Sequence, residues 1–383
     1  MDRYLGRSRC SFTFLAIAVL FTLLSPAKEV LSDPLIQQVI SDLYSDEPIL
    51  DAEEHFETFK RTFGKKYKSD EEHTSRFEIF KGNMRKARIH QKLDPSAIHG
   101  VTQFSDLTYE EFEKGYLGVD NGMEWNLFRN ASGETEAPIL PTEVPDDFDW
   151  RKHGAVTEVE DQGSCGSCWS FSAVGALEGA NYLATGKLIS LSKQQLLDCD
   201  HECDPSDPDS CDSGCQGGLM RNAFEYLFKA GGIQSEKSYP YRGEDGHKCQ
   251  FERSKIAASV KSFSVISSDP NQIAANLVKN GPLAVGINAI YMQTYRGGVS
   301  CPYLCCKNVD HGVLLVGYGK AAYSQIRMKK KPYWIIKNSW GDQWGEDGYY
   351  KICRERNICG VDSMVSMVSV EDIKSTTYTS HSH

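Results

Sequence analysis

The spacing of hydrophobic positions near the N-terminus predicts two amphipathic helices. Apolar side chains recur three or four residues apart from Asp51 onwards, which is the period of a helix. Asp51 and Glu54 resemble a capping box for the first helix, and Gly64 can stop it. Asp70 can cap the second helix. The two apolar stripes consist of Phe56, Phe59 and Phe63, and of Phe77, Phe80, Met84 and Ala87.

The remaining pattern predicts four more helices and then strands. The helices have recognisable caps, and the strands are rich in β-branched and aromatic residues. Because helices come first and antiparallel strands last, we expect an α+β fold in which a helical lobe packs against a strand lobe. The helices are Cys168–Ala184 before Gly186, a segment from Ser192 and Gln195 towards Cys199, Leu219–Ala230 before Gly231, and a segment starting at Asp269-Pro270. The strands are Leu283–Asn288, Gly312–Gly317, Tyr333–Lys337 and Tyr349–Cys353.

Residues 118–147 have the composition of a linker. Glycine, proline and acidic residues dominate this stretch, so we expect few core contacts and good accessibility. It holds the chain's single Asn-X-Ser/Thr sequon, Asn130-Ala131-Ser132. Glycosylation of Asn130 and an unmodified sequon are equal alternatives.

Composition and charge narrow the class of protein. The 383 residues are 40% hydrophobic and 25% charged, a balance typical of globular proteins. The net charge of −10 disfavours nucleic-acid binding, which needs a basic face. Thirteen cysteines indicate metal sites in a reducing cytosol or disulfides in an oxidising compartment.

The N-terminus favours the oxidising compartment. Three arginines precede the largely apolar run Cys10–Leu24, and small residues follow it up to Ala27. This pattern predicts a secretory signal peptide. The alternative is a membrane anchor, but the run is shorter than the roughly 20 residues needed to span a bilayer. No later segment is long and apolar enough, so we expect no membrane span.

Cys168 is the candidate nucleophile. It lies where the glycine-rich stretch Gln162–Ser167 becomes a helix, and a helix N-terminus favours a thiolate. Two alternatives are a redox dithiol of Cys165 with Cys168 and a structural disulfide. A thioredoxin motif would follow a strand of an early βαβ unit, and the sequence shows no such unit.

A histidine and an amide complete the candidate chemistry. His311 opens one predicted strand and Asn338 ends the next, so Asn338 can orient the imidazole if these strands pair. Trp340 can shield that hydrogen bond from water. With Cys168 they form a Cys-His-Asn constellation. The Gln162 side chain can join the Cys168 backbone N–H in stabilising an oxyanion.

These residues resemble those of the papain-like cysteine proteases. The strings QGSCGSCWSFS, CQGG, VDHGV and KNSWG match that family's signatures in order, over about residues 145–370. The region of the two predicted N-terminal helices matches the spaced ERFNAQ pattern of the cathepsin F-like branch, which includes plant vacuolar proteases. The matching residues are Glu72, Arg76, Phe80, Asn83, Ala87 and Gln91. Gly100, Phe104 and Asp106 resemble the GNFD prosegment motif, with Thr102 where Asn is usual.

The resemblance implies a two-lobed papain-like fold with the active-site cleft between the lobes. It divides the chain into a signal peptide (1–27), an inhibitory propeptide (28–140), a peptidase domain (141–370) and a loose tail (371–383). The helical propeptide would lie in the cleft at neutral pH. At acidic pH the carboxylates that anchor it would be protonated, its binding would weaken, and it would be removed. Cys168 and His311 would then hydrolyse peptide bonds as a thiolate–imidazolium pair, through a thioester. The resemblance implies no metal and no cofactor.

The resemblance also assigns substrate contacts. Gly217 and Gly218 would bind the substrate backbone, and Asp310 would lie at the same site. An apolar pocket would take the side chain two residues before the cut, favouring Leu, Val or Phe. Its lining would be Leu219, Met220, Gly286, Val309, Gly312 and Met364; the alternative is that these residues are core. Because the stretch from Met220 to Tyr241 holds no long cleft-blocking insertion, we expect an endopeptidase.

The resemblance pairs most of the cysteines. It implies the disulfides Cys165–Cys215, Cys199–Cys249 and Cys305–Cys359. Cys203 and Cys211 flank an acidic insert and are expected to pair, which leaves Cys301 with Cys353. Because Cys306 adjoins Cys305, either of them can be the partner of Cys359.

Location and partners follow from the same resemblance. We expect the secretory pathway and then a vacuole or lysosome, with the extracellular space as the alternative. The expected partners of this monomer are protein and peptide substrates, its own propeptide and cystatin-like inhibitors. An inhibitor or binding protein without catalysis is the other class of function. Intact Cys168, His311, Asn338 and Gln162 argue against it.

Overall fold

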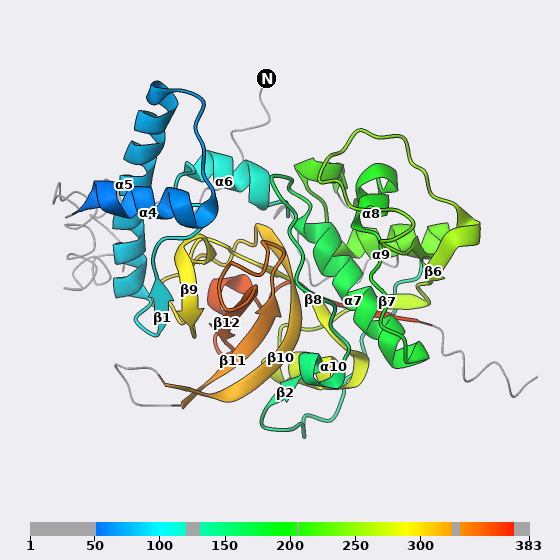
Figure 1. Cartoon of the computed structure of the whole chain (residues 1–383). Helices are drawn as coiled ribbons and strands as arrows, with labels where there is room; N and C mark the ends of the chain where they lie inside the picture. Colours follow the sequence, from blue (N-terminus) through cyan, green and yellow to red (C-terminus); the bar gives the residue numbers. More distant parts are fainter. Residues whose placement is uncertain (1–50, 120–130, 205–206, 324–329, 371–383) are drawn as a thin grey trace, which may run out of the picture.

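The computed structural model describes residues 51–119, 131–204, 207–323 and 330–370 (Figure 1). The predicted signal peptide, the sequon residue Asn130 and the C-terminal tail lie outside these residues. The described chain forms an N-terminal leader (residues 51–119), a helical lobe and a strand lobe. Short 3₁₀ helices lie at Trp150–His153, Gly214–Gln216, Arg253–Lys255, Met292–Thr294 and Ile358–Gly360.

The leader contains three helices, α4 (Ala52–Phe63), α5 (Asp70–Leu93) and α6 (Tyr109–Tyr116). The predicted capping box of α4 is wrong, because Asp51 has a left-handed backbone and its side chain makes no capping bond. Ser69 rather than Asp70 caps α5, since its extended backbone lets the hydroxyl accept from the Glu72 N–H. Helix α6 was not predicted, although a complete capping box of Thr108 and Glu111 opens it.

The helical lobe is built on α7, the long helix that begins at the candidate nucleophile. Its helices are α7 (Cys168–Thr185), α8 (Lys193–Cys199) and α9 (Met220–Ala230). Gly186 and Gly231 adopt left-handed backbones and end α7 and α9, as the sequence predicts. The lobe also carries two small two-stranded sheets: the hairpin of β3 (Cys203–Asp204) with β4 (Asp207–Cys211), and β5 (Ile233–Gln234) with β6 (Ile256–Ala258).

The strand lobe is one antiparallel sheet in the order β12-β11-β10-β8-β13-β7, with β2 also paired to β10. Helix α7 packs along this sheet, between it and the other helices of the helical lobe (Figure 1). The strands are β2 (Phe148–Asp149), β7 (Ser262–Val265), β8 (Leu283–Ile287), β10 (His311–Tyr323), β11 (Lys330–Lys337), β12 (Tyr349–Cys353) and β13 (Val365–Ser369), and α10 is Pro270–Asn280.

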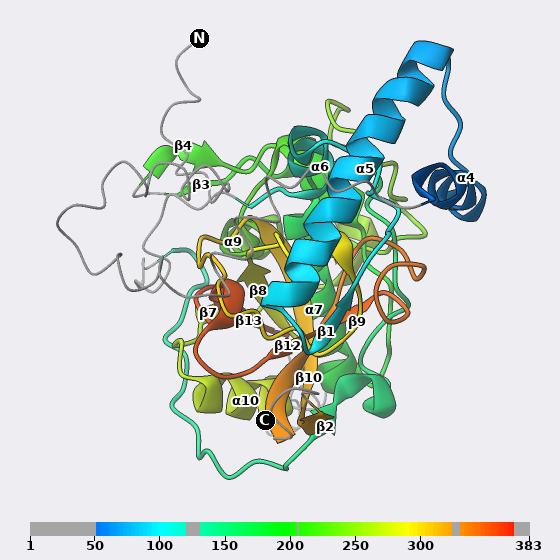
Figure 2. The ribbon, with the colours of Figure 1, turned by 90° about the vertical axis from the view of Figure 1, so that its left-hand side faces the viewer.

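The leader shares its core with the strand lobe. Its strand β1 (Ala97–His99) pairs antiparallel with β9 (Tyr295–Gly298). Figure 2 shows α5 standing out from the body, with its C-terminal end beside these two strands. Phe104 and Phe112 are fully buried, and their rings lie 5.0 and 5.4 Å from that of Trp340. Burying large aromatic side chains in this way is strongly favourable, so the leader is firmly docked.

Five disulfides join residues that the structure describes: three pairs are those that the resemblance implies, and two are those expected from the remaining cysteines. Cys305, rather than the adjacent Cys306, bonds to Cys359. Among the described cysteines, Cys168 is the free thiol. A redox dithiol of Cys165 with Cys168 is therefore not formed, because Cys165 is bonded to Cys215. The pairs are Cys165–Cys215, Cys199–Cys249, Cys203–Cys211, Cys301–Cys353 and Cys305–Cys359.

The expectation of an accessible linker at residues 118–147 is wrong in part. Val119, Glu134 and Leu140 are buried. Glu134 forms a buried ion pair with Arg221 of α9. Thr135 and the carbonyl of Gly133 bond to the backbone of Phe263 in β7. Backbone pairing and this ion pair hold residues 133–135 in place, although the composition of the stretch predicts none of these contacts.

Candidate active site

The two lobes meet at Cys168 and His311. Cys168 is the first residue of α7, and His311 is the first residue of β10. The Ser172 hydroxyl, one turn along α7, donates to the Val313 carbonyl of β10 at 2.7 Å. Gly312 donates its N–H to the Cys168 sulfur at 3.3 Å. A Cβ at Gly312 would lie 3.1 Å from the Cys168 carbonyl oxygen, so glycine permits this close approach.

His311 is held in one orientation from two sides. Strands β10 and β11 pair antiparallel with Leu314 opposite Lys337, which brings Asn338, the next residue after β11, within hydrogen-bonding distance of His311. The imidazole Nε2 donates to the Asn338 carbonyl oxygen at 2.8 Å. The fully buried Trp340 ring stacks on the imidazole with centroids 4.6 Å apart. This hydrogen bond places the ring proton on Nε2, so Nδ1 keeps its lone pair and can accept a proton.

Gln162 is buried and fully bonded. Its side-chain oxygen accepts from the Ser339 hydroxyl at 2.6 Å. Its amide nitrogen donates to the Cys165 carbonyl at 2.7 Å and to the Tyr116 carbonyl at 3.2 Å. Tyr116 belongs to the leader. The Gln162 amide, which is the candidate oxyanion donor, is therefore already bonded to a backbone carbonyl of the leader.

The leader crosses the cleft and bonds to both of its walls. Gly118 and Val119 donate their N–H groups to the Asp310 carbonyl at 3.1 and 3.2 Å. On the opposite wall the Gly218 N–H donates to the Gly118 carbonyl at 2.9 Å. A Cβ at Gly118 would lie 1.9 Å from the Gly166 carbonyl oxygen, so this position excludes any side chain. Cys168 is fully buried beneath this segment.

The covered site favours neutral groups. Burial raises the pKa of the Cys168 thiol to about 12, and the nearby Asp310 carboxyl adds to that effect. Burial also lowers the pKa of His311 to about 4. The thiolate–imidazolium pair that the resemblance implies is therefore disfavoured here, because the leader keeps water away from both charges.

The residues assigned to the apolar pocket lie together. Leu219, Met220, Val309 and Met364 are buried members of the same hydrophobic cluster as Cys168. Gly286 lies opposite Gly312 in the register of β8 and β10, and a Cβ on Gly286 would lie 2.8 Å from the Met364 sulfur. Val119 of the leader belongs to the same cluster.

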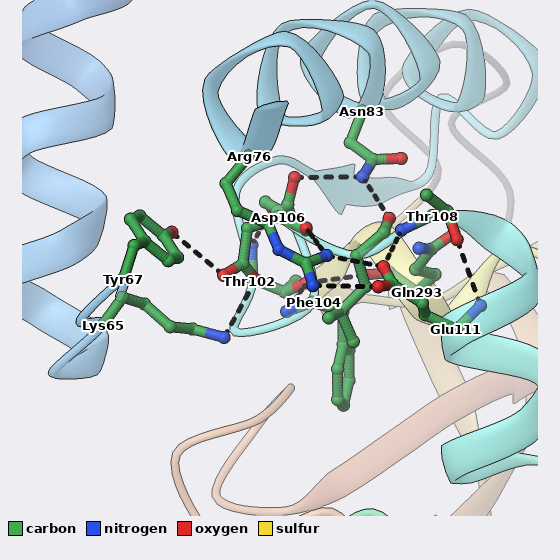
Figure 3. Close-up of polar contacts among 12 residues, drawn as sticks. Lys65, Tyr67, Arg76, Asn83, Thr102, Phe104, Asp106, Thr108, Glu111 and Gln293 are labelled. Carbon is green, nitrogen blue, oxygen red and sulfur yellow. Dashed lines mark hydrogen bonds and ion pairs between the residues drawn. The ribbon is translucent and has the colours of Figure 1, made fainter. Parts of the chain in front are cut away.

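The ERFNAQ residues hold the leader itself together (Figure 3). Arg76 bonds to both carboxylate oxygens of Glu111, at 2.6 and 2.8 Å. Asn83 donates to two carbonyls of the loop that precedes α6, both at 2.9 Å. Thr102 stands at the position where the GNFD motif has Asn. Its hydroxyl donates to the backbone carbonyl of Gln293, a residue outside the leader, at 2.6 Å.

Three leader residues that bond to the strand lobe are not predicted from the sequence. The Asp94 carboxylate accepts from the Ser300 hydroxyl at 2.6 Å and from the Cys301 N–H at 2.7 Å. His90 and His99 both bond to the Thr294 hydroxyl, at 2.7 and 2.9 Å. Asp94 follows the last residue of α5 and has a non-helical backbone, so helical periodicity gives no signal for these contacts.

Within the described parts of the chain, no helix has the length and hydrophobicity required to cross a membrane.

Comparison with known proteins agrees with this geometry. Residues 144–369 match the family described as papain family cysteine protease, and residues 56–112 match the cathepsin propeptide inhibitor domain (I29). The probable cysteine protease RD19B of Arabidopsis thaliana is 60% identical over 355 residues, which cover 92% of this chain and 96% of that protein. Cathepsin F of Mus musculus is 42% identical over 321 residues, covering 82% of this chain and 64% of that protein. The solved structure of digestive procathepsin L2 from Tenebrio molitor has a TM-score of 0.71 and 34% identity, covering 83% of this chain and 100% of that one. The chain belongs to the papain family of cysteine proteases, and its inhibitory propeptide domain makes it a zymogen.

Proposed function

We propose that the chain is a cysteine endopeptidase whose nucleophile is Cys168. His311 Nδ1 takes the thiol proton, and the thiolate attacks a peptide carbonyl. The N–H groups of Gln162 and Cys168 stabilise the oxyanion. His311 then protonates the leaving amine, and water hydrolyses the thioester with His311 as base. The observation that carries this proposal is the 2.8 Å bond between His311 and Asn338, which orients the imidazole across the cleft from Cys168.

The proposal includes endopeptidase activity, which is cleavage inside a substrate chain, and the cellular location of the enzyme. The residues from Met220 to Tyr241 are taken up mainly by α9 and β5, which leaves no inserted segment to block the cleft. We expect a secreted zymogen with the boundaries 1–27, 28–140, 141–370 and 371–383, delivered to a vacuole or lysosome, or to the extracellular space. We expect a monomer that takes protein substrates and is open to cystatin-like inhibitors.

The first expected result concerns maturation. Acidification of the purified zymogen should yield an active chain that starts near residues 134–145. Cleavage needs accessible backbone, and Pro141, Thr142 and Glu143 are exposed whereas Val119 is buried in the cleft. N-terminal sequencing of the active product measures the start. An active enzyme that starts near residue 28 would contradict the expected boundary.

The second expected result concerns specificity. A fluorogenic Leu-Arg dipeptide should have a kcat/KM about tenfold or more above that of an Arg-Arg dipeptide. The proposed pocket is apolar, and burying a leucine side chain is worth about 1.5–3 kcal/mol. The Asp310 carboxylate already accepts from the Ala289 N–H at 2.8 Å and from the Asn288 amide at 3.1 Å. An arginine in the pocket would therefore lose hydration without gaining a partner.

Both dipeptides keep Arg at the cleaved bond, so they differ at one subsite. A higher kcat/KM for Arg-Arg would show that Leu219, Met220, Gly286, Val309, Gly312 and Met364 do not form that pocket.

A further inference from the structure

Two buried carboxyls flank the disulfide hairpin of the helical lobe. Asp200 follows α8, and Asp212 follows β4. Their exposed fractions are 0% and 2%. Between them, strands β3 and β4 are closed by the Cys203–Cys211 bond. Neither residue has a role in the proposed reaction, although burying two acidic groups side by side is costly.

Asp212 is bonded to the segment Gly217–Leu219, which meets the leader in the cleft. One carboxylate oxygen of Asp212 accepts from the Leu219 N–H at 2.8 Å and from the Asn222 amide at 3.2 Å. A Cβ on Gly218 would lie 2.8 Å from the same oxygen, so the carboxylate lies directly against this glycine. Gly218 is the residue whose N–H holds the Gly118 carbonyl. The Asp212 carboxylate therefore supports this segment from the side opposite the leader.

Asp200 faces Asp212. One oxygen of Asp200 accepts from the Glu202 N–H at 3.0 Å. The second oxygen of each carboxyl is buried without a donor, while the two side chains are within hydrogen-bonding reach of each other. Two carboxylates cannot bond to each other, but one proton between them satisfies both orphaned oxygens.

The ionic surroundings favour such a proton. Glu202 at the base of the hairpin faces the pair, and so do Lys229 and Tyr226 of α9. Lys229 already bonds to Glu202 at 2.8 Å and to Glu225 at 3.0 Å. Burial raises the pKa of Asp200 to about 7, and that of Asp212 well above its usual value.

We propose that Asp212 is a positioning residue for the substrate-binding segment Gly217–Leu219, and that Asp200 holds it in place through a shared proton. This inference rests on the proposed function in one respect, because it takes Gly217 and Gly218 as the residues that bind the substrate backbone. The pair touches no substrate atom. It acts by fixing the N–H groups and carbonyls with which that segment receives an extended peptide.

Four variants of the acid-activated enzyme test the proposal. Asp212→Leu removes the acceptor of the Leu219 N–H, and Asp200→Leu removes its supporting carboxyl. Asp212→Asn and Asp200→Asn introduce side chains of similar size to leucine. Unlike leucine, the asparagine amide can donate a hydrogen bond to the other carboxyl, in place of the shared proton. We expect KM for a blocked Leu-Arg substrate to rise about tenfold or more in Asp212→Leu and by a smaller factor in Asp200→Leu, with kcat within about threefold. Both asparagine variants should stay within about twofold of the wild-type KM.

A second substrate separates positioning from general damage. A blocked glycine ester is too short to reach the Gly217–Leu219 segment, so its kinetics should be the same in all four variants. Asp245→Leu is the control, because the Asp245 carboxylate holds the neighbouring Cys215 N–H at 2.9 Å and does not bond to that segment. Active enzyme is counted by iodoacetamide labelling of Cys168.

The outcomes distinguish the two proposals. Wild-type enzyme that neither hydrolyses peptides nor labels at Cys168 would overturn the proposed function. An active wild type with an unchanged KM in Asp212→Leu would overturn only the positioning role. Equal loss with both substrates, or asparagine variants as defective as the leucine ones, would also overturn it. If Asp212→Leu does not accumulate, the comparison of leucine with asparagine at Asp200 decides alone.

Discussion

Replacing Cys168 with alanine should lower peptide hydrolysis by about 10⁵–10⁶-fold, the scale on which enzymes lose activity with their nucleophile. The thiol accepts a bond from Gly312 at 3.3 Å and is the free thiol among the described cysteines. Its side chain is small and buried, so alanine should leave the zymogen folded. The measurement is hydrolysis of a fluorogenic peptide at acidic pH.

The Cys168→Ala zymogen needs a trace of wild-type enzyme to remove its leader, because it should not process itself. After that treatment, iodoacetamide should label one fast thiol in the wild type and none in the variant. A redox protein would instead need Cys165 paired with Cys168, whereas the structure joins Cys165 to Cys215. Appreciable hydrolysis by the processed variant would refute the assignment of the nucleophile.

The sequence predicts well those elements that carry their own local signals. Helices α7 and α9 end where Gly186 and Gly231 supply left-handed backbones. Strand β10 is harder, because Gly317 and Gly319 look like its end while the strand continues to Tyr323. Those glycines are required by close packing. A Cβ on Gly317 would lie 2.5 Å from a backbone oxygen, and one on Gly319 would lie 2.7 Å from a tyrosine hydroxyl.

The candidate site also contains residues that carry a local sequence signal and contacts that depend on residues distant in sequence. Cys168, His311 and Asn338 stand in distinctive local strings, so the amino-acid sequence alone predicts them. The resemblance predicts that the propeptide lies in the cleft, but the residues that cover Cys168 could not be predicted, because Gly118 and Val119 lie in a stretch with the composition of a linker. Their order comes from backbone bonds to residues that are distant in sequence. The pairing of Asp200 with Asp212 likewise depends on how a hairpin folds back, which periodicity does not report.

The same contact between the leader and the strand lobe predicts how acid releases the leader. The resemblance implies protonation of anchoring carboxylates, and the structure adds a buried histidine. His90 is fully buried, with Nδ1 bonded to the Thr294 hydroxyl at 2.7 Å and Nε2 without a partner in the described structure. Its ring lies 4.5 Å from that of Tyr291 and 5.5 Å from that of His99. Lys86 lies one turn before it on α5.

These surroundings disfavour a charged imidazole. Burial lowers the pKa of His90 well below its usual value, and the charges of Lys86 and His99 lower it further. The Asp94 carboxylate is bonded to His99, Ser300 and the Cys301 N–H rather than to His90. Docking of the leader therefore favours neutral His90.

The sign of the pH dependence follows by linkage. In a released leader His90 titrates near its ordinary pKa of about 6.5, so between that pH and the lower docked pKa the released form binds more protons. Stability of the docked state is present above about pH 6.5 and is lost as the pH falls below it. Acidification through this range favours release of the leader from Cys168.

His90→Gln should therefore shift self-processing of the zymogen to lower pH, by roughly one pH unit, because an amide does not take up the proton. The measurement is the pH at which half of the zymogen is processed in a fixed time. His55→Gln is the matched control, since His55 is exposed on α4 and should leave that pH unchanged. A variant that only weakened the contact would process at higher pH, so the direction of the shift decides. An upward shift or no shift in His90→Gln would remove His90 from the mechanism and leave the carboxylates as the acid sensors of the leader.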